Sequence, residues 1–229
     1  MGRARGSAVR IAVLGTGVVG TTVGDKLVQI GHEVRMGART PDSEKAAAWV
    51  AGAGSGASQG TFADAAASGD VVFNCTAGTA SLQALQMAGT ENLAGRILID
   101  LANPLDFSKG MPPTLSVSND DSLGEQIQRW FPRTRVVKTL NTVNCEVMVE
   151  PALAGADHDL FLCGNDAEAK AQVTAWLGEW FGWKPANVID LGDITAARGT
   201  EMLLPLWIRL MLTSGSPHFN FKVVRPGAA

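Results

Sequence analysis

The stretch that most constrains the fold of this chain is residues 9–20. Residues 9–14 form a β-branched and apolar run that predicts a buried parallel strand, and Gly15, Gly17 and Gly20 follow it. Beyond the glycines, apolar residues return at the spacing of a helix. The glycines are therefore expected to lie on a turn that leads from a strand into a helix.

A glycine turn in this position is suited to binding the phosphates of a dinucleotide. Gly15 permits the tight turn, Gly17 lets the backbone approach a pyrophosphate, and Gly20 lets the helix pack closely on the strand. The free N–H groups and the positive dipole end of the helix would then face the anion. A glycine-rich turn without a ligand is the alternative, and the pattern downstream favours the dinucleotide.

Composition narrows the class of protein. The 229 residues are 46% hydrophobic, enough for one globular domain or for one domain with a small appendage. A formal net charge of -3 and an aromatic content of 6% give no general attraction to nucleic acid or to an anionic membrane. We therefore expect no nucleic-acid partner and no membrane partner.

The cysteines and the N-terminus indicate the compartment. Cys75, Cys145 and Cys163 are far apart, odd in number and set in apolar surroundings, which favours buried thiols over disulfides or a metal site. Residues 1–8 contain arginines but no apolar run, and we expect a flexible tail there. These features predict a cytoplasmic protein.

The end of the second predicted strand indicates which dinucleotide is bound. Residues 33–36 alternate as a strand does, and where a fold that prefers NAD usually carries an acidic residue, this chain carries Arg39. A guanidinium suits a 2′-phosphate, with Lys45 and the Thr16 hydroxyl close enough to contribute. NADP is therefore the expected cofactor. The alternative is that Arg39 and Lys45 are solvated surface charges, and Glu33 lies too early in the strand to hold a ribose.

The rest of the chain alternates between strands and helices. Further strands are predicted at residues 61–62, 70–75, 96–101, 135–140, 159–163, 187–191 and 219–224, and helices at 43–50, 63–68, 81–87, 122–130, 167–181 and 195–212. Residues 51–60 and 107–121 are predicted as loops, the second a lid or substrate loop. The Asn-Asp-Asp stretch at residues 119–121 is expected to cap the helix at 122–130. This order predicts an α/β doubly wound (Rossmann-type), mainly parallel sheet with a small C-terminal α/β extension. Residues 9–150 would form the NADP-binding domain, and residues 151–229 would close the cleft.

In such a sheet, ligands collect at the carboxyl ends of the strands. Residues 76–78 follow one predicted strand, and Asn103 and Pro104 follow the next. We expect both segments beside the cofactor. Cys75 is expected to be a packed side chain and not a reactive thiol.

Acid–base residues are scarce in this sequence. Tyr is absent, which excludes a Ser-Tyr-Lys reductase. His32 is expected at the surface, and His158 and His218 in structural roles. Lys138 is the one candidate acid, but its place within a strand favours a packed or surface lysine. We therefore assign no catalytic side chain.

Five segments together carry a resemblance to a known family. They are the glycine turn, residues 37–39 (GAR), residues 100–105 (DLANPL), residues 138–143 (KTLNTV), and the C-terminal part that contains residues 159–166 and 192–201. The chain resembles the NADPH-dependent coenzyme F420 oxidoreductases, small Rossmann proteins that pass hydride between NADP and the deazaflavin coenzyme F420. It departs from them at Ala38, where relatives often have Ser, and at Thr139-Leu140, which replace a small–aromatic pair.

The resemblance implies the cofactor-binding residues and the reaction. The residues expected to contact the cofactors are Gly15, Thr16, Gly17, Val18, Val19, Ala38, Arg39, Thr40, Lys45, Thr76, Ala77, Gly78, Asn103, Pro104, Leu105, Asn141 and Val143, of which Asn103, Pro104, Leu105, Asn141 and Val143 would line the place where the second cofactor stacks on the nicotinamide. The reaction implied is hydride transfer between NADP(H) and F420 or a similar flavin-like acceptor. The alternatives are an NADPH-dependent reductase of a small imine or β-hydroxyacid, and an NADP sensor without turnover.

The helix predicted at residues 195–212 is apolar on nearly every face around Pro205. A helix of this kind must be buried, either in the cleft wall or against a second subunit. We expect a homodimer that uses this helix.

Overall fold

The computed structural model describes residues 8–155 and 157–226. Of the tail predicted at residues 1–8, residues 1–7 lie outside this range. None of the helices in the described part of the chain has the length and apolar character needed to span a membrane.

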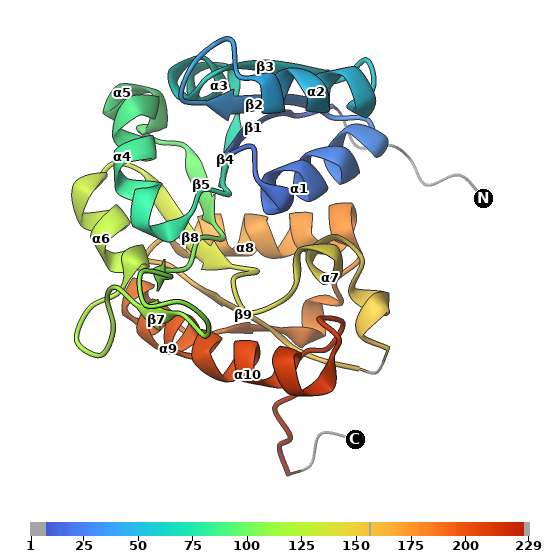
Figure 1. Ribbon diagram of the computed structural model, residues 1–229, viewed down its shortest axis with the longest axis vertical. Coiled ribbons are helices and arrows are strands. Elements are labelled where there is room, and N and C mark those ends of the chain that lie inside the picture. Colours follow the sequence, from blue (N-terminus) through green and yellow to red (C-terminus); the bar gives the residue numbers. More distant parts are fainter. Residues whose placement is uncertain (1–7, 156, 227–229) are drawn as a thin grey trace.

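The described residues build a twisted eight-stranded sheet (Figure 1). In spatial order its strands are β10 (Val188–Asp190), β9 (Leu160–Cys163), β8 (Arg135–Thr139), β5 (Ile97–Asp100), β4 (Val71–Asn74), β1 (Arg10–Leu14), β2 (Glu33–Ala38) and β3 (Ala57–Thr61). Neighbouring strands pair in parallel except β8 and β9, which are antiparallel. The predicted doubly wound, mainly parallel sheet is therefore confirmed.

Helices cover both faces of the sheet, each over its own apolar core. One face packs against α1 (Val18–Gln29), α2 (Glu44–Ala53), α7 (Cys145–Val149) and α8 (Ala167–Trp176), and the other against α3 (Phe62–Ser68), α4 (Gly78–Ala88), α6 (Leu123–Trp130) and α9 (Ala197–Met202). The short α5 (Thr90–Leu93) follows α4, and α10 (Leu204–Ser214) lies along the bottom of Figure 1. Single turns occupy Pro151–Ala154, Pro185–Asn187 and Ile194–Ala196, and a π-helical segment, Leu177–Phe181, extends α8.

The loop predicted at residues 51–60 is wrong, because α2 continues to Ala53 and β3 runs from Ala57 to Thr61. This strand lies at the edge of the sheet and is built of small and polar residues, so it lacks the apolar run that indicates a buried strand. The strand predicted at residues 61–62 is wrong at its second residue, since Thr61 caps α3 and Phe62 begins it.

The connection over residues 107–121 is not wholly irregular. β6 (Leu105–Asp106), just before this connection, pairs with β7 (Thr114–Leu115), within it, as a two-stranded antiparallel sheet. The predicted acidic cap of α6 is also wrong, because Ser122 caps the helix and Asp121 forms an ion pair with Arg129 at 2.8 Å.

The helix predicted at residues 195–212 divides at Leu203, since Pro205 lacks an N–H group and starts a new helix. Leu204, Trp207 and Ile208 are buried. The other side of α10 is not buried within this chain, since Leu206, Leu210 and Leu212 are exposed by 52%, 38% and 51%. Burial of this side in the cleft wall is therefore wrong, and its burial against a second subunit stays a prediction.

The strand predicted at residues 219–224 does not form. The backbone N–H of Asp159 donates to the Phe221 carbonyl oxygen at 2.9 Å, as in a strand pair. The N–H of Val223, however, donates to the Asp159 carboxylate and not to a backbone carbonyl oxygen. Lys222 forms an ion pair with the same carboxylate. Side-chain bonds therefore replace the strand ladder here.

His32 was expected at the surface and is buried instead. It lies edge-on against Trp180 with ring centroids 4.9 Å apart, and burial lowers the pKa of its imidazole. The structural roles expected for His158 and His218 fit their contacts, with the Pro151 carbonyl oxygen and with Glu146.

Candidate functional site

A cleft of about 740 Å³ opens at the carboxyl ends of β1, β2 and β4. Of the residues predicted to bind the cofactor, it is lined by Gly15, Thr16, Gly17, Ala38, Arg39, Thr40, Lys45, Thr76 and Ala77. Apart from Lys45, which lies on α2, these residues come from three strand ends that are far apart in the sequence and adjacent in the sheet. The parallel topology brings them together, as the sequence analysis expected.

The glycine turn has the geometry that each glycine requires. Gly15 has a φ of +118°, and a Cβ on Gly20 would lie 2.1 Å from the Gly15 carbonyl oxygen. At Gly17, by contrast, an added Cβ would meet no atom within 4 Å. Gly20 is therefore needed for packing, whereas Gly17 borders the open space of the cleft.

This difference predicts opposite outcomes for two alanine variants. Gly20→Ala is expected to destabilise the fold by several kcal/mol, because Cβ and backbone would overlap. Gly17→Ala should leave the melting temperature nearly unchanged and weaken dinucleotide binding. Thermal unfolding without ligand measures the first effect, and calorimetric titration with NADPH measures the second. Equal losses of stability in the two variants would contradict these roles.

Two helices point uncapped N-termini toward the cleft. α1 follows Gly17 and α4 follows Ala77, and neither end has a side-chain cap or an acidic residue in its first turn. The helices α2, α3, α6 and α8 all carry side-chain caps. The N–H groups and dipoles of α1 and α4 are thus available to an anionic ligand.

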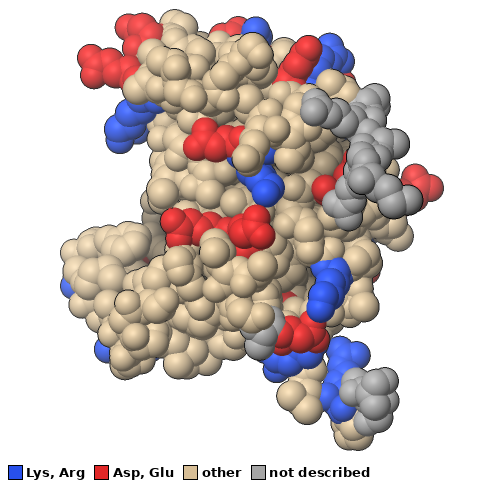
Figure 2. Space-filling view, turned by 90° about the vertical axis from the view of Figure 1, so that its right-hand side faces the viewer, with Lys and Arg blue, Asp and Glu red and all other residues tan. Residues whose placement is uncertain are grey.

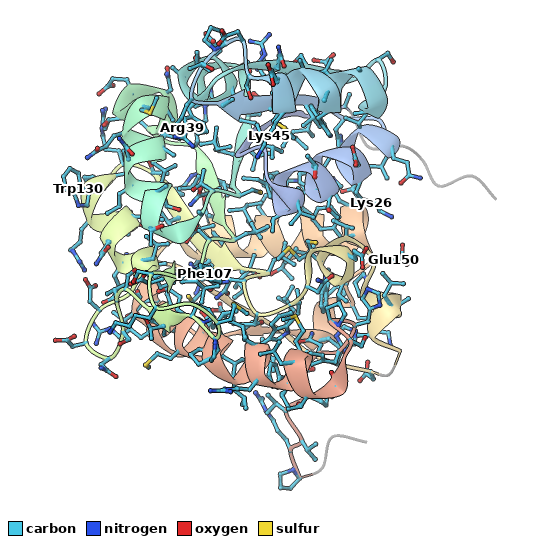
Figure 3. All side chains as sticks on the ribbon, viewed as in Figure 1. Lys26, Arg39, Lys45, Phe107, Trp130 and Glu150 are labelled. Atoms are coloured by element: carbon cyan, nitrogen blue, oxygen red, sulfur yellow. The ribbon has the colours of Figure 1, made fainter. Side chains whose placement is uncertain are left out.

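A basic corner lies at the end of β2. Arg39 and Lys45 are both exposed and line the cleft with Thr40 and Ser43, and Figure 3 shows both cations in the upper half of the molecule, above Phe107. Among the described residues that line the cleft, none is acidic. The corner therefore offers two positive charges and two hydroxyl groups to a phosphate.

Part of the cleft wall lies outside the residues predicted from the sequence. The additional lining residues are Gly37, Ser43, Phe62, Cys75, Ala80, Gln83, Ala84 and Met87. Those on α4 recur at intervals of three and four residues after the predicted segment 76–78, so helical periodicity could have identified them. Cys75 is buried, and burial raises the pKa of its thiol well above the ordinary value, as expected for a packed cysteine.

The remaining predicted residues do not line this cleft. Val18 is 69% exposed at the start of α1, Val19 packs against the core, and Val143 is buried in that core. Gly78 begins α4 against the next loop, where a Cβ would lie 1.9 Å from the Asn103 carbonyl oxygen.

Asn103 and Asn141 join the ends of β5 and β8. Asn103 Nδ2 donates to the Asn141 carbonyl oxygen at 2.8 Å, and Asn141 Nδ2 donates to Asn103 Oδ1 at 2.9 Å. The buried Oδ1 of Asn141 has no partner among the described residues. Pro104 is buried beside this pair, and half-buried Leu105 packs against the cluster around Trp207.

Lys138 is buried behind the strand ends, and the expectation of a packed residue is confirmed over that of a surface residue. Its Nζ lies 2.8 Å from Asp100 Oδ2 and 2.9 Å from Glu201 Oε1, and it also donates to the Ala102 carbonyl oxygen. Burial disfavours the charge on Lys138, but the two carboxylates outweigh burial and raise the pKa of its ammonium group. With three acceptors for its three hydrogens, Lys138 has no proton available for a substrate.

The two carboxylates are held by backbone groups as well. Glu201, on α9, accepts the N–H groups of Leu123 and Gly124 at the start of α6, at 2.8 and 3.0 Å. Asp100 accepts the N–H of Ala102 at 3.2 Å. Sequence reasoning did not identify this cluster, because its members are separated by long stretches of chain.

Comparison with known proteins identifies relatives. A model of the family described as NADP oxidoreductase coenzyme F420-dependent matches residues 10–104. The F420-dependent NADP reductase of Methanocaldococcus jannaschii is 32% identical over 148 residues, so the match spans 64% of this chain and 64% of that protein. The activity of that protein therefore does not transfer directly.

Solved structures give a fuller match. A putative F420-dependent NADP-reductase from Arthrobacter sp. FB24 is 52% identical, with a TM-score of 0.90, covering 95% of this chain and 100% of that chain. A reductive aminase from Aspergillus terreus, in complex with NADPH and ethyl levulinate, is 18% identical with a TM-score of 0.64, covering 91% of this chain and 63% of that chain. The second likeness shows a shared fold alone.

Proposed function

Since the chain belongs to the family of F420-dependent NADP oxidoreductases, we propose that it transfers hydride between NADP(H) and the deazaflavin coenzyme F420 or a similar flavin-like acceptor. Family membership rests on the 52% identity that extends over the whole of the Arthrobacter chain. The observation in this structure that best supports the proposal is the basic corner at the end of β2.

The basic corner would hold the 2′-phosphate that distinguishes NADP from NAD. Arg39 can bond such a phosphate through two N–H groups, and Lys45 adds a second charge. Thr40 and Ser43 supply hydroxyl groups on the same side of the cleft. An NAD site would need a carboxylate here to accept the ribose hydroxyl, and the described lining residues include none.

The glycine turn and α1 would hold the pyrophosphate. The backbone at Gly17 borders open space, and the first N–H groups of α1 have no side-chain cap. The structure thus fits the cofactor at both of its phosphate positions.

Hydride transfer between two cofactors requires contact between their rings and exclusion of water, and it requires no acid or base. The bound nicotinamide supplies or accepts the hydride. For the second cofactor we propose a place against Asn103 and Leu105, beyond the end of β5, where the asparagine pair fixes the loop. The mutual bonds of Asn103 and Asn141 would hold this wall rigid during the transfer.

The structure gives little support to the alternative of an imine or β-hydroxyacid reductase, because the candidate acid for that reaction is not available. Such a reaction needs an acid in the cleft, and Lys138, the candidate for that role, is buried with its hydrogens engaged by Asp100, Glu201 and Ala102. The likeness to the reductive aminase shows the fold and gives this alternative no further support. The other alternative, an NADP sensor without turnover, is distinguished from an enzyme by the activity assay that follows.

The test is NADPH oxidation followed at 340 nm with F420, with FMN and with no acceptor. Turnover with F420, well above the rate without acceptor, is the expected result. Tight NADPH binding with flat traces in all three reactions would overturn the enzymatic proposal and favour a sensor. Turnover with an imine and none with F420 would favour the small-substrate reductase.

We also propose that the protein is a homodimer and that the exposed side of α10 forms the interface. Met202, Leu206, Leu210 and Leu212 are exposed large apolar residues on α9 and α10, and Figure 2 shows mostly uncharged atoms over the lower part of the molecule on the left. An apolar surface of this kind typically marks a contact with another protein.

The dimer is tested by light scattering during size-exclusion chromatography. The wild-type chain is expected at about twice its mass of 24.0 kDa, and Leu206→Glu with Leu210→Glu should shift it to the monomer without unfolding it. A monomer at every concentration of the wild type would count against the proposal.

We also propose that the protein is cytoplasmic. Cys75, Cys145 and Cys163 are free thiols, which supports a reducing cytoplasm. We further propose that the segment after residue 150 closes one side of the site. The contact of Glu201 with Lys138 supports this, because it ties the C-terminal part to β8.

A further inference from the structure

A buried chain of hydrogen bonds leads from Lys138 to the cleft. Lys138 donates to Asp100 Oδ2, and Asn74 Nδ2 donates to Asp100 Oδ1 at 2.7 Å. Asn74 Oδ1 then accepts the Thr76 hydroxyl at 2.6 Å and the Thr76 N–H at 3.3 Å. Asn74, Asp100 and Lys138 are at most 1% exposed, whereas Thr76 lines the cleft.

The direction of each bond in this chain is fixed. Both oxygens of Asp100 accept, one from Lys138 and the other from the Ala102 N–H, so the group of Asn74 that faces Asp100 must be its NH2. The opposite amide orientation would set oxygen against oxygen at Asp100 and nitrogen against the N–H of Thr76. The Asn74 oxygen therefore faces Thr76.

The fixed amide determines what Thr76 can offer a ligand. A hydroxyl has one hydrogen, and in Thr76 that hydrogen goes to Asn74 Oδ1. Ser81 Oγ, 2.7 Å from Thr76 Oγ1, must then be the donor of their shared bond, because two hydroxyl oxygens this close need a hydrogen between them. The other acceptor near Ser81 Oγ, the Ala77 carbonyl oxygen, is farther away at 3.3 Å. Thr76 is left with an unused lone pair and no hydrogen, so it can accept a hydrogen bond from a ligand and cannot donate one.

We propose that Asn74 is a positioning residue for the dinucleotide, which makes Thr76 an acceptor for a sugar hydroxyl of NADP. The proposal rests on the assignment of NADP to this cleft. Asp100 and Lys138 act behind Asn74 by holding its amide in one orientation. An acceptor fixed in advance avoids the cost of reorienting the hydroxyl when the ligand binds.

The test is a double-mutant cycle on NADPH binding. Replacing Lys138 itself would leave Asp100 and Glu201 without their cation and threaten the fold, so the cycle uses Asn74→Ala, which leaves that ion cluster intact. Calorimetry would measure the Kd of NADPH for the wild type, Asn74→Ala, Thr76→Val and the double variant. Each single change is expected to raise the Kd about 5- to 10-fold, the value of one hydrogen bond. The double variant should lie within about twofold of Thr76→Val alone.

Steady-state kinetics supply a second readout. The KM for NADPH should rise in Asn74→Ala, with kcat and the KM for F420 changed less than about twofold. Asn187→Ala is the matched control, since Asn187 is also a buried asparagine that bonds through Nδ2 but lies far along the sheet beside Asp157. It should lower the melting temperature and leave the Kd of NADPH unchanged.

Two results would overturn the role of Asn74. One is a lower melting temperature of Asn74→Ala with an unchanged Kd of NADPH. The other is a Kd in the double variant that equals the product of the two single increases, which would show that Asn74 and Thr76 act independently. If either result is found and the wild-type chain still binds NADPH, only the role of Asn74 is rejected and the proposed function stands. A wild-type chain that does not bind NADPH rejects both.

Discussion

Replacing Lys138 with methionine is expected to lower the free energy of unfolding by about 3–5 kcal/mol, the cost of leaving a buried charge without its partner. Methionine fits the volume of the lysine stem, so the loss reports the charge and not a cavity. Asp100 and Glu201, both at most 1% exposed, would lose the cation that lies between them. Urea unfolding at pH 7 measures the change.

The matched control for this variant is Lys26→Met. Lys26 pairs with Glu150 at 3.5 Å, and the two meet at the surface on the right of Figure 3. An exposed pair contributes about 0–1 kcal/mol, so this variant should be nearly as stable as the wild type. If the two variants lost similar amounts of unfolding free energy, the buried cluster would not be more important for stability than a surface ion pair.

The contribution of Lys138 to stability also depends on pH. The pKa of Lys138 in the folded chain is raised above the ordinary value of 10.5, so its stabilising contribution is fully present below about pH 10.5 and is lost only as the pH rises through the folded pKa. The methionine variant lacks this contribution at every pH. The stability gap between variant and wild type should therefore stay constant through neutral pH and narrow only as the pH rises above about 10.5.

Much of the cleft could be predicted from the sequence because its signals are local. The glycines, the missing acid and Arg39 all lie within a few residues of a strand end, and parallel strands place their carboxyl ends at one edge. The face of α4 that adds Gln83 and Met87 was missed, although its period was visible in the sequence. The fold class follows from the same alternation of strands and helices.

The ion cluster could not be predicted, because no local pattern connects its members. Lys138 lies in a strand of otherwise apolar character, and its partners come from β5 and from α9. Only the tertiary fold decides whether such a lysine is a surface residue, an acid or a buried cation. The exposed side of α10 is a related case. Its apolar sequence predicts burial in the cleft wall or against a second subunit, and only the structure shows that Leu206 and Leu210 are exposed within this chain.

Arg39→Ala is expected to raise the Kd of NADPH by about 10- to 100-fold and that of NADH by less than about twofold, because a hydrogen bond to a charged group contributes about 1.5–3 kcal/mol. Arg39 lies in the exposed basic corner of the cleft, so part of its attraction for a phosphate is screened by salt. The loss of NADPH affinity should therefore be larger at 20 mM than at 500 mM NaCl. Calorimetric titration with both dinucleotides measures the selectivity.

Lys45→Ala and Arg96→Ala separate a specific contact from general charge. Lys45 shares the basic corner, and its removal should weaken NADPH in the same direction but less, since an ammonium cannot form the paired bonds of a guanidinium. Arg96 pairs with Asp70, next to the start of β4 and so at the opposite edge of the sheet from the cleft, and its removal should change neither Kd. Equal weakening of NADPH and NADH by Arg39→Ala would show that Arg39 stacks on the adenine or supports the loop. In that case the preference for NADP would have to come from Lys45, Thr40 and Ser43.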